Sequence, residues 1–431
     1  MKRVVVLAML VLSLLAFSVN LIFLVGDGMS ANTILLASML EGRILEIMKL
    51  PYTGLTITYS ADSWVTDSAP AGTALFAGLK TLNRAINVLP NGEKVESLFK
   101  MAQKAGYATG IVVTCRVTHA TPAAVYGAVS DRNDEVTLAK QLAEAGINVI
   151  FGGGRDMFLP TSKGGRRNDG LDLIEKMRSD GYTVITKKDE LPNVKGDKVL
   201  GLFAMGHLKP VSERTEEPTL GEMTRKAIEL LAASGKPFAL MVEGSQIDWE
   251  SHANDYYGIW KETVEFDEAV RVAIDFAKRD GNTLVVVIGD HETGGLSLSN
   301  GGYTINIEQA RKGKGTARMF LRQFSINDKA KFAEGLKEWY GISITDAEYN
   351  YLRNVPSNQL ERELARYISG KMGFGFTTYD HTAGVIPVYA FGPGAELFVG
   401  WMDNTEVAFK IMNIMKLKTI SFPKVSAAAG Y

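Results

Sequence analysis

Short apolar runs alternate with amphipathic segments over most of the 431-residue chain. Such alternation is typical of a largely parallel central sheet with helices on both faces, so we predict an α/β fold. The runs predicted as strands are Leu21–Val25, Gly110–Val113, Val149–Phe151, Val199–Phe203, Phe238–Val242, Thr283–Ile288 and Val385–Ala390. The predicted helices include Glu96–Ala105, Glu135–Ala145, Leu171–Ser179, Leu220–Ala233 and Trp260–Arg279.

The alternation is interrupted between Asn300 and about Phe376. This segment is rich in charge, and its pattern predicts helices near Asp328–Trp339, Thr345–Arg353 and Gln359–Met372. We interpret residues 300–376 as a mostly helical insertion, serving as a lid, a subunit contact or padding. The predicted organisation is one α/β domain over residues 19–431 that carries this insertion.

The N-terminus resembles a secretory signal. Two basic residues precede an apolar run from Val4 to Phe17, and a small residue, Ser18, follows it. A membrane-spanning helix needs about 20 apolar residues, so residues 1–18 are predicted to be a signal peptide. We therefore expect an exported protein, periplasmic or extracellular. Cys115 is the only cysteine, which excludes a disulfide within the chain.

Charge limits the classes of partner. The chain has 47 Lys and Arg residues against 48 Asp and Glu residues, with a net charge of -1. It therefore lacks the basic excess by which proteins bind nucleic acids or anionic membranes. We expect a small or locally recognised partner, no nucleic-acid binding and no stable membrane anchor.

Acidic residues and histidines follow several of the predicted strands. Ligands of parallel sheets gather at the carboxyl ends of the strands. Carboxylates beside buried strands need a compensating charge, which a shared cation would supply. The polar residues at these positions are Asp27, His119, Thr121, Glu243, Asp290 and His291.

A further pair of possible ligands lies on a predicted helix. If a helix begins near Asp248, then Asp248 and His252 are four residues apart and face the same way. The alternative is a capped helix start with surface acids. His381 lies in a loop before a strand, whereas His207 has no acid near it in the sequence and is expected to be a histidine without a ligand role. Mixed Asp and His ligands favour Zn²⁺ or a similar ion.

Ser68 stands between Asp67 and an Ala-rich segment that is predicted to be a helix. Its hydroxyl would point the same way as the first N–H groups of that helix, which suits an anion. Ser68 is therefore either the helix N-cap or a nucleophile. Arg132 is a candidate for two hydrogen bonds to a phosphate, although a lone arginine is commonly a surface residue.

Taken together, these motifs resemble those of the alkaline phosphatases, in the same order, from about Leu21 to Gly394. The motifs are Gly-Asp-Gly-Met at 26–29, Thr-Asp-Ser-Ala at 66–69, Ala-Thr-Pro-Ala at 120–123, Val-Glu-Gly-Ser-Gln-Ile-Asp at 242–248, Asp-His at 290–291 and His-Thr at 381–382. The resemblance implies broad hydrolysis of phosphate monoesters through a phosphoserine at Ser68, with Arg132 binding the phosphate. It also implies a homodimer.

The resemblance also implies how the cations are held. One ion would bind Asp248, His252 and His381, and its neighbour Asp27, Asp290, His291 and the Ser68 oxygen. A third would bind Asp27, Thr121 and Glu243. We expect Zn²⁺, or Co²⁺ in its place, at the first two sites and Mg²⁺ or another divalent ion at the third.

Two positions vary within the family. His119 stands where some members have Asp, which adds it to the candidate ligands and makes the third site less suited to Mg²⁺ and better suited to Zn²⁺ or Co²⁺ than an Asp would. Trp249 stands where others have Lys or His and offers a phosphate no charge. The alternatives are a related phosphodiesterase or sulfatase, or an exported binding protein without turnover. A sulfatase would be expected to have an Arg shortly after Ser68, and none follows here.

Overall fold

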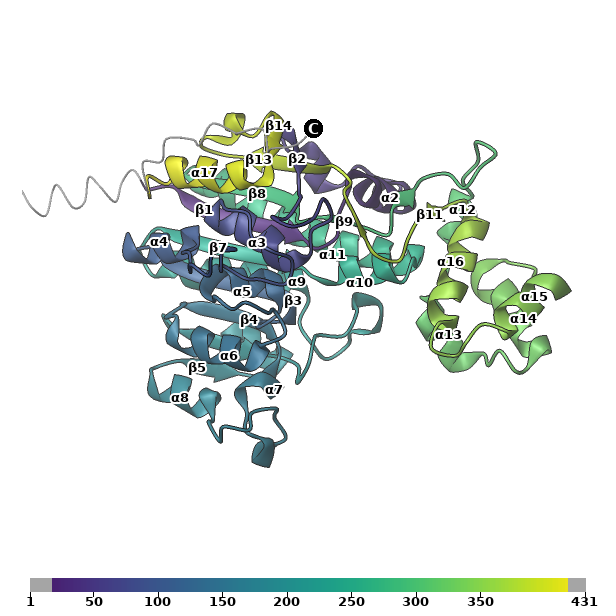
Figure 1. Ribbon diagram of the computed structural model, residues 1–431, viewed down its shortest axis with the longest axis horizontal. Coiled ribbons are helices and arrows are strands. Elements are labelled where there is room, and N and C mark those ends of the chain that lie inside the picture. The colour runs from purple at the N-terminus through teal and green to yellow at the C-terminus, as the bar shows by residue number, and fades with distance from the viewer. Residues whose placement is uncertain (1–17, 418–431) are drawn as a thin grey trace, which may run out of the picture.

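The computed structural model describes residues 18–417, and the predicted signal peptide lies outside them apart from Ser18. A ten-stranded sheet runs through the molecule in the order β14-β2-β13-β8-β1-β7-β3-β4-β6-β5 (Figure 1). Its strands are β1 (Asn20–Gly26), β2 (Tyr52–Ile57), β3 (Ala108–Arg116), β4 (Val149–Gly153), β5 (Thr183–Ile185), β6 (Val199–Leu202), β7 (Phe238–Gly244), β8 (Thr283–Gly289), β13 (Ile386–Phe391) and β14 (Gly400–Asp403). All neighbours pair in parallel except β13, which is antiparallel to β8 and β2. The predicted α/β fold and all seven predicted strands are confirmed.

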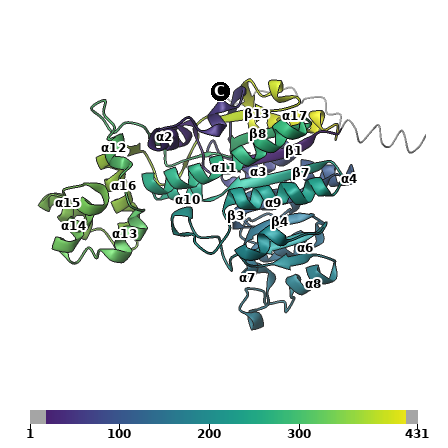
Figure 2. The ribbon, with the colours of Figure 1, turned by 180° about the vertical axis from the view of Figure 1, so that it is seen from behind.

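Helices cover both faces of the sheet, as Figures 1 and 2 show from opposite sides. Alternate residues of β1 enter two separate cores: Ile22 and Leu24 pack on one side, Leu21 and Phe23 on the other. The first core is covered by α2 (Ala31–Glu41), α9 (Leu220–Ala233) and α11 (Tyr256–Asp280). The second is covered by α3 (Ser68–Ala77), α4 (Leu98–Lys104), α5 (Ala120–Tyr126), α6 (Glu135–Glu144), α8 (Leu173–Ser179) and α17 (Asn404–Ile414).

The segment between β10 (Leu296–Ser297) and β11 (Gly375–Phe376) forms a helical lobe beside the sheet (Figure 1). Its helices are α12 (Ile307–Ala310), α13 (Ala317–Gln323), α14 (Lys329–Tyr340), α15 (Asp346–Arg353) and α16 (Leu360–Met372). Phe320, Phe332 and Leu336 are buried within it. The predicted helical character of residues 300–376 is confirmed.

The lobe is attached to the junction between α10 (Gln246–His252) and α11. The amide of Ala317 donates to Asp255 Oδ2 at 2.7 Å, and the hydroxyl of Ser369 donates to the carbonyl of Asn254 at 2.8 Å. Arg318 donates to Glu250 Oε1 at 2.9 Å. Burial raises the pKa of Glu250 to about 7, and the Arg318 charge opposes this shift.

We expect Arg318→Met to lower the free energy of unfolding by about 2 kcal/mol, because it leaves the buried Glu250 without its cationic partner. Arg322→Met is the matched control, since Arg322 is paired with Glu213 alone and its side chain is 62% exposed. It should change stability by less than about 0.5 kcal/mol. Urea unfolding of the two variants measures the difference, and equal effects would contradict the assigned role of Glu250.

Candidate metal centre and nucleophile

The candidate site lies where three parallel strands end. Gly26 of β1 is paired with Gly244 of β7 and with Gly289 of β8, so these strands stop side by side. The next residues along β1 and β8 are Asp27 and Asp290. The parallel register therefore brings together acids that are far apart in the sequence.

Asp27, Asp290 and His291 form a first buried cluster, here called cluster A, and each is 0% exposed. His291 Nε2 lies 3.5 Å from Asp27 Oδ1 and 3.3 Å from Asp290 Oδ2. The amide of Gly28 donates to Asp290 Oδ1 at 3.0 Å. Neither carboxylate oxygen of Asp27 has a hydrogen-bond partner within residues 18–417.

The electrostatics of cluster A disfavour ionised carboxylates without a cation. Burial and the neighbouring carboxylates raise the pKa of Asp27 well above its usual value. Burial likewise raises the pKa of Asp290, to about 8, and lowers the pKa of His291 well below its usual value. A divalent ion would offset these costs, because it supplies positive charge directly to the buried oxygens.

Asp248, His252 and His381 form a second cluster, cluster B. The predicted helix is confirmed as α10, which places Asp248 Oδ2 3.3 Å from His252 Nε2. His381, on β12 (His381–Thr382), has its Nε2 3.5 Å from Asp248 Oδ1. Burial opposes ionisation of Asp248, but His252 and the other imidazoles lower its pKa well below the usual value.

Backbone carbonyls orient the two imidazoles of cluster B. His252 Nδ1 contacts the carbonyl of Tyr379, and His381 Nδ1 contacts that of Thr66 at 2.8 Å. A carbonyl only accepts, so both Nδ1 atoms carry the proton. This leaves Nε2 of each ring as the atom that would bind a cation placed beside Asp248, as in metal-binding imidazoles generally.

Cys115, His119 and Glu243 form a third cluster, cluster C, whose ligand atoms lie within 4.8 Å of one another. Thr121, the remaining candidate, is fully buried in α5, which begins just after His119. Burial raises the pKa of Glu243 to about 7, although hydrogen bonds from Ser245 and Cys115 oppose the shift. The sequence alone gave no reason to place Cys115 here, because a lone cysteine indicated only that a disulfide is absent.

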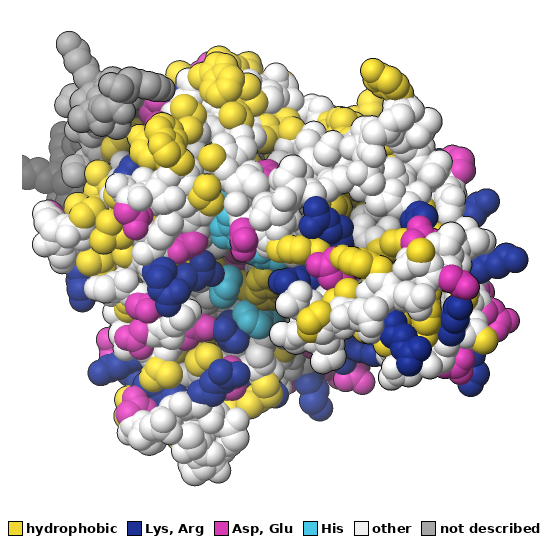
Figure 3. Space-filling view, turned by 45° about the vertical axis from the view of Figure 1, so that its right-hand side comes forward, with side chains coloured by type: hydrophobic (Ala, Val, Ile, Leu, Met, Phe, Trp, Pro, Cys, Tyr) yellow, Lys and Arg dark blue, Asp and Glu magenta, His cyan; other side chains and the backbone are white. Residues whose placement is uncertain are grey.

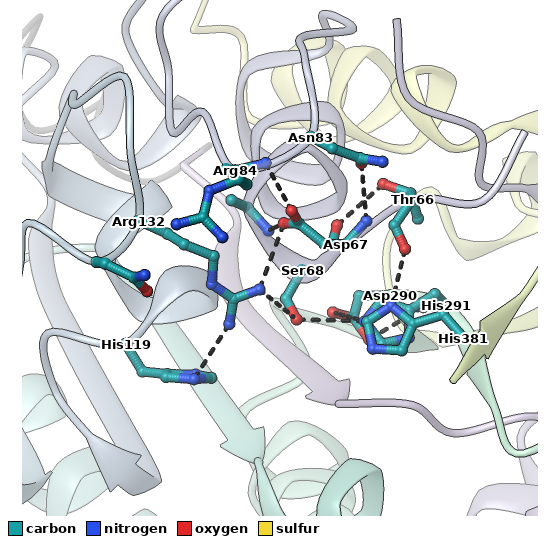
Figure 4. Close-up of polar contacts among 12 residues, drawn as sticks. Thr66, Asp67, Ser68, Asn83, Arg84, His119, Arg132, Asp290, His291 and His381 are labelled. Carbon is teal, nitrogen blue, oxygen red and sulfur yellow. Dashed lines mark hydrogen bonds and ion pairs between the residues drawn. The ribbon is translucent and has the colours of Figure 1, made fainter. Parts of the chain in front are cut away.

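Ser68 lies between His291 of cluster A and Arg132, whose guanidinium contacts His119 of cluster C (Figure 4). Its Oγ is 3.2 Å from His291 Nε2 and 3.5 Å from Arg132 Nη1. The N-cap of α3 is Asp67, whose Oδ1 accepts from the amide of Ala69 at 2.7 Å, so the alternative prediction that Ser68 is the N-cap is wrong. The Ser68 hydroxyl is therefore not engaged in capping the helix.

Arg132 lies on the opposite side of Ser68 from cluster A (Figure 4). Its Nη1 donates to Asp67 Oδ1 at 3.3 Å, and its Nη2 donates to His119 Nε2 at 3.1 Å. Its side chain is 18% exposed. The surface alternative for Arg132 is therefore wrong, and the guanidinium can reach an anion bound at Ser68.

An aromatic group adjoins cluster C. The ring of His207 lies 4.4 Å from that of Trp249 and 5.7 Å from that of His119. His207 belongs to none of the three clusters found within residues 18–417. Its ring adjoins cluster C because the loop after β6 returns to β3, where the amide of Arg116 donates to His207 Nδ1 at 3.1 Å. Figure 3 shows histidine side chains gathered in a hollow next to the helical lobe.

The donor set fits divalent cations. Clusters A and B combine carboxylates with imidazoles, which suits Zn²⁺ or Co²⁺. Unpartnered oxygens on Asp27, Glu243 and Asp290 are the groups that a cation would satisfy.

Among the helices within residues 18–417, none is long and apolar enough to cross a membrane.

Comparison with known proteins gives consistent results. The family model described as alkaline phosphatase matches residues 18–417. Alkaline phosphatase 4 of Bacillus subtilis is 35% identical over 419 residues, which cover 92% of this chain and 88% of that protein. The crystal structure of Thermus thermophilus alkaline phosphatase has a TM-score of 0.84 at 30% identity and covers 93% of this chain and 92% of that one.

A second similar structure contains a metal ion. It is a mutant alkaline phosphatase from an Antarctic bacterium, solved with Mg bound. Its TM-score is 0.71 at 29% identity, and the match covers 93% of this chain and 99% of that chain.

Proposed function

Because this chain belongs to the alkaline phosphatase family, we propose that it hydrolyses phosphate monoesters through a phosphoserine formed on Ser68. The observation that carries the proposal is the position of Ser68 Oγ, 3.2 Å from His291 Nε2 of cluster A and within reach of Arg132. A nucleophile, a set of metal ligands and a phosphate-binding guanidinium therefore meet at one point.

Three cations are proposed to complete the site. Zn²⁺, or Co²⁺ in its place, would be held by clusters A and B, with Ser68 as a further ligand of the first. Mg²⁺ or another divalent ion would be held near cluster C by Asp27, Thr121 and Glu243, with His119 beside it. Bound ions of this kind lower the pKa of a hydroxyl or water and stabilise charge on phosphoryl oxygens.

The remaining steps belong to the chain's own residues. Ser68 Oγ attacks phosphorus, the bond to the alcohol oxygen breaks, and that oxygen takes a proton as the alcohol leaves. Water then attacks the phosphoserine, which releases inorganic phosphate and returns a proton to Ser68. Arg132 holds two phosphoryl oxygens in both steps, because its planar fork matches them. No residue of clusters A to C is assigned to binding the alcohol part of the substrate. We therefore propose that the enzyme accepts a broad range of phosphate monoesters.

Comparison of nitrophenyl phosphate with bis-nitrophenyl phosphate tests this reaction class. We expect the monoester to be hydrolysed faster, because Arg132 and the cations need free phosphoryl oxygens that a diester partly lacks. A faster diester rate would favour the phosphodiesterase alternative. A protein that binds phosphate but releases no nitrophenol from either compound would favour the binding-protein alternative.

We further propose that the mature protein is exported and forms a homodimer. Support for export comes from the pattern of residues 1–18, and support for the dimer comes from the family resemblance alone. Cell fractionation and light scattering of the purified protein measure the two properties.

A further inference from the structure

The only thiol of the chain lies in cluster C. Cys115 is on β3 and is 0% exposed, and its Sγ lies 3.3 Å from Glu243 Oε2. Neither the sequence pattern nor the family resemblance gave this residue a role. Sulfur is a strong donor to Zn²⁺ and Co²⁺ and a poor one to Mg²⁺, so its presence changes the chemistry of this position.

Buried oxygens without partners point to a ligand here, independently of the thiol. Glu243 is 0% exposed, and its Oε1 has no hydrogen-bond partner within residues 18–417. Both carboxylate oxygens of Asp27, whose charge interacts with that of Glu243, are likewise without partners in this range. Oε2 of Glu243 is already taken by the Ser245 hydroxyl at 2.8 Å, which leaves Oε1 for another group.

The spacing in cluster C suits one ion. Cys115 Sγ, an imidazole nitrogen of His119 and a carboxylate oxygen of Glu243 lie within 4.8 Å of one another. Two atoms bound to the same Zn²⁺ at about 2.0–2.3 Å in tetrahedral geometry are about 3.3–3.8 Å apart. Cys115 Sγ and Glu243 Oε2 are already 3.3 Å apart, and a shift of up to about 1.5 Å would bring the His119 nitrogen to a common ion.

We propose that Cys115 is a ligand of the cation at the third site, and that this site consequently holds Zn²⁺ or Co²⁺ in preference to Mg²⁺. Binding displaces the thiol proton to solvent and forms a bond between the metal and a thiolate sulfur. The inference rests on the proposed function for the existence of the third ion, but its test reads the sulfur–metal bond directly.

The competing interpretation is that Cys115 only donates a hydrogen bond to Glu243, as Ser245 does. A hydroxyl can replace the thiol as a hydrogen-bond donor to Glu243, but it cannot replace a thiolate as a ligand of the cation. Cys115→Ser keeps a donor of similar size at that position but removes the sulfur, so it preserves the hydrogen bond and abolishes thiolate ligation. Ser245→Ala does the reverse, because it removes a donor to the same carboxylate oxygen and keeps the thiol.

The test is the optical titration of metal-free protein with Co²⁺. A thiolate bound to Co²⁺ gives a charge-transfer band in the near ultraviolet, and with one cysteine in the chain this band has a single source. We expect the band in the wild type and in Ser245→Ala and its loss in Cys115→Ser. We also expect Cys115→Ser to weaken Co²⁺ binding at one site by at least about tenfold relative to Mg²⁺.

A wild-type protein that binds three equivalents of Co²⁺ without a charge-transfer band would overturn the role of Cys115 while leaving the proposed phosphatase function intact. A protein that binds no Co²⁺ would overturn both. Because the decisive spectrum is that of the wild type, failure of a variant to fold does not remove the test.

Discussion

Ser68→Ala is expected to lower kcat for a phosphate monoester by about 10⁴-fold, because it removes the hydroxyl that lies between His291 and Arg132 and is proposed to form the covalent intermediate. The helix should survive the change, since Asp67 and not Ser68 caps α3. Metal content should stay close to that of the wild type, because clusters A and B keep all their carboxylates and imidazoles. The measurements are steady-state kinetics, elemental analysis and trapping of the phosphoenzyme with labelled phosphate at low pH.

Ser63→Ala is the matched control for this prediction. Ser63 lies a few residues before Ser68, and within residues 18–417 its hydroxyl has one hydrogen-bond partner, the amide of Val65, from which it accepts at 3.1 Å. It should leave kcat and phosphoenzyme formation unchanged. Comparable activity of Ser68→Ala and the wild type would remove the nucleophile from the proposal and favour direct attack by water or a protein without turnover.

The strands that build the site could be predicted because they are buried on both faces. Phe238–Val242 and Thr283–Ile288 are continuous apolar runs, and both are central strands in the structure. β2, β5 and β14 were missed because they lie at or near the sheet edges, where exposed residues interrupt the pattern. The direction of strand pairing also could not be predicted from local sequence. The apolar run that ends at Ala390 does not indicate that β13 is antiparallel to its neighbours.

The candidate ligands could be found because acids next to apolar strands need an explanation. Cys115 and His207 could not, since their neighbours in the sequence are not their neighbours in space. The pairing of β3 with β4 is irregular between Val112 and Arg116, the stretch that contains Cys115. The loop that carries His207 to Trp249 is held by backbone hydrogen bonds from the amide of Leu208 to Thr114 and from the amide of Gly154 to Gly206, which no local sequence pattern reports.

Removal of the cations with a chelator is expected to abolish hydrolysis and to make the metal-free protein less stable as the pH rises from about 6.5 to 8. Asp290 has a pKa of about 8 when folded, against 3.8 in the unfolded chain, and Glu243 one of about 7 against 4.5. Between the unfolded and folded pKa values of each group, the folded state binds more protons than the unfolded state. The free energy of unfolding of the metal-free protein therefore falls as the pH increases through these ranges. His252, whose pKa is raised from 6.5 to about 9, acts in the same direction over this range.

The range from pH 6.5 to 8 is chosen because the buried imidazoles have the opposite effect on stability only at lower pH. The pKa values of His119 and His291 are lowered from 6.5 by burial, so they make the folded state more stable as the pH rises only up to about 6.5. The melting temperature of the chelated protein should therefore be lower at pH 8 than at pH 6.5. Protein reloaded with Zn²⁺ should not show this decrease. Asp290→Asn in the chelated protein should reduce the fall, because an amide does not titrate. The melting temperature of the metal-free protein could instead stay constant or rise over this range. That result would show that the carboxylates of clusters A and C are not buried with raised pKa values, and it would remove the basis for placing cations beside them.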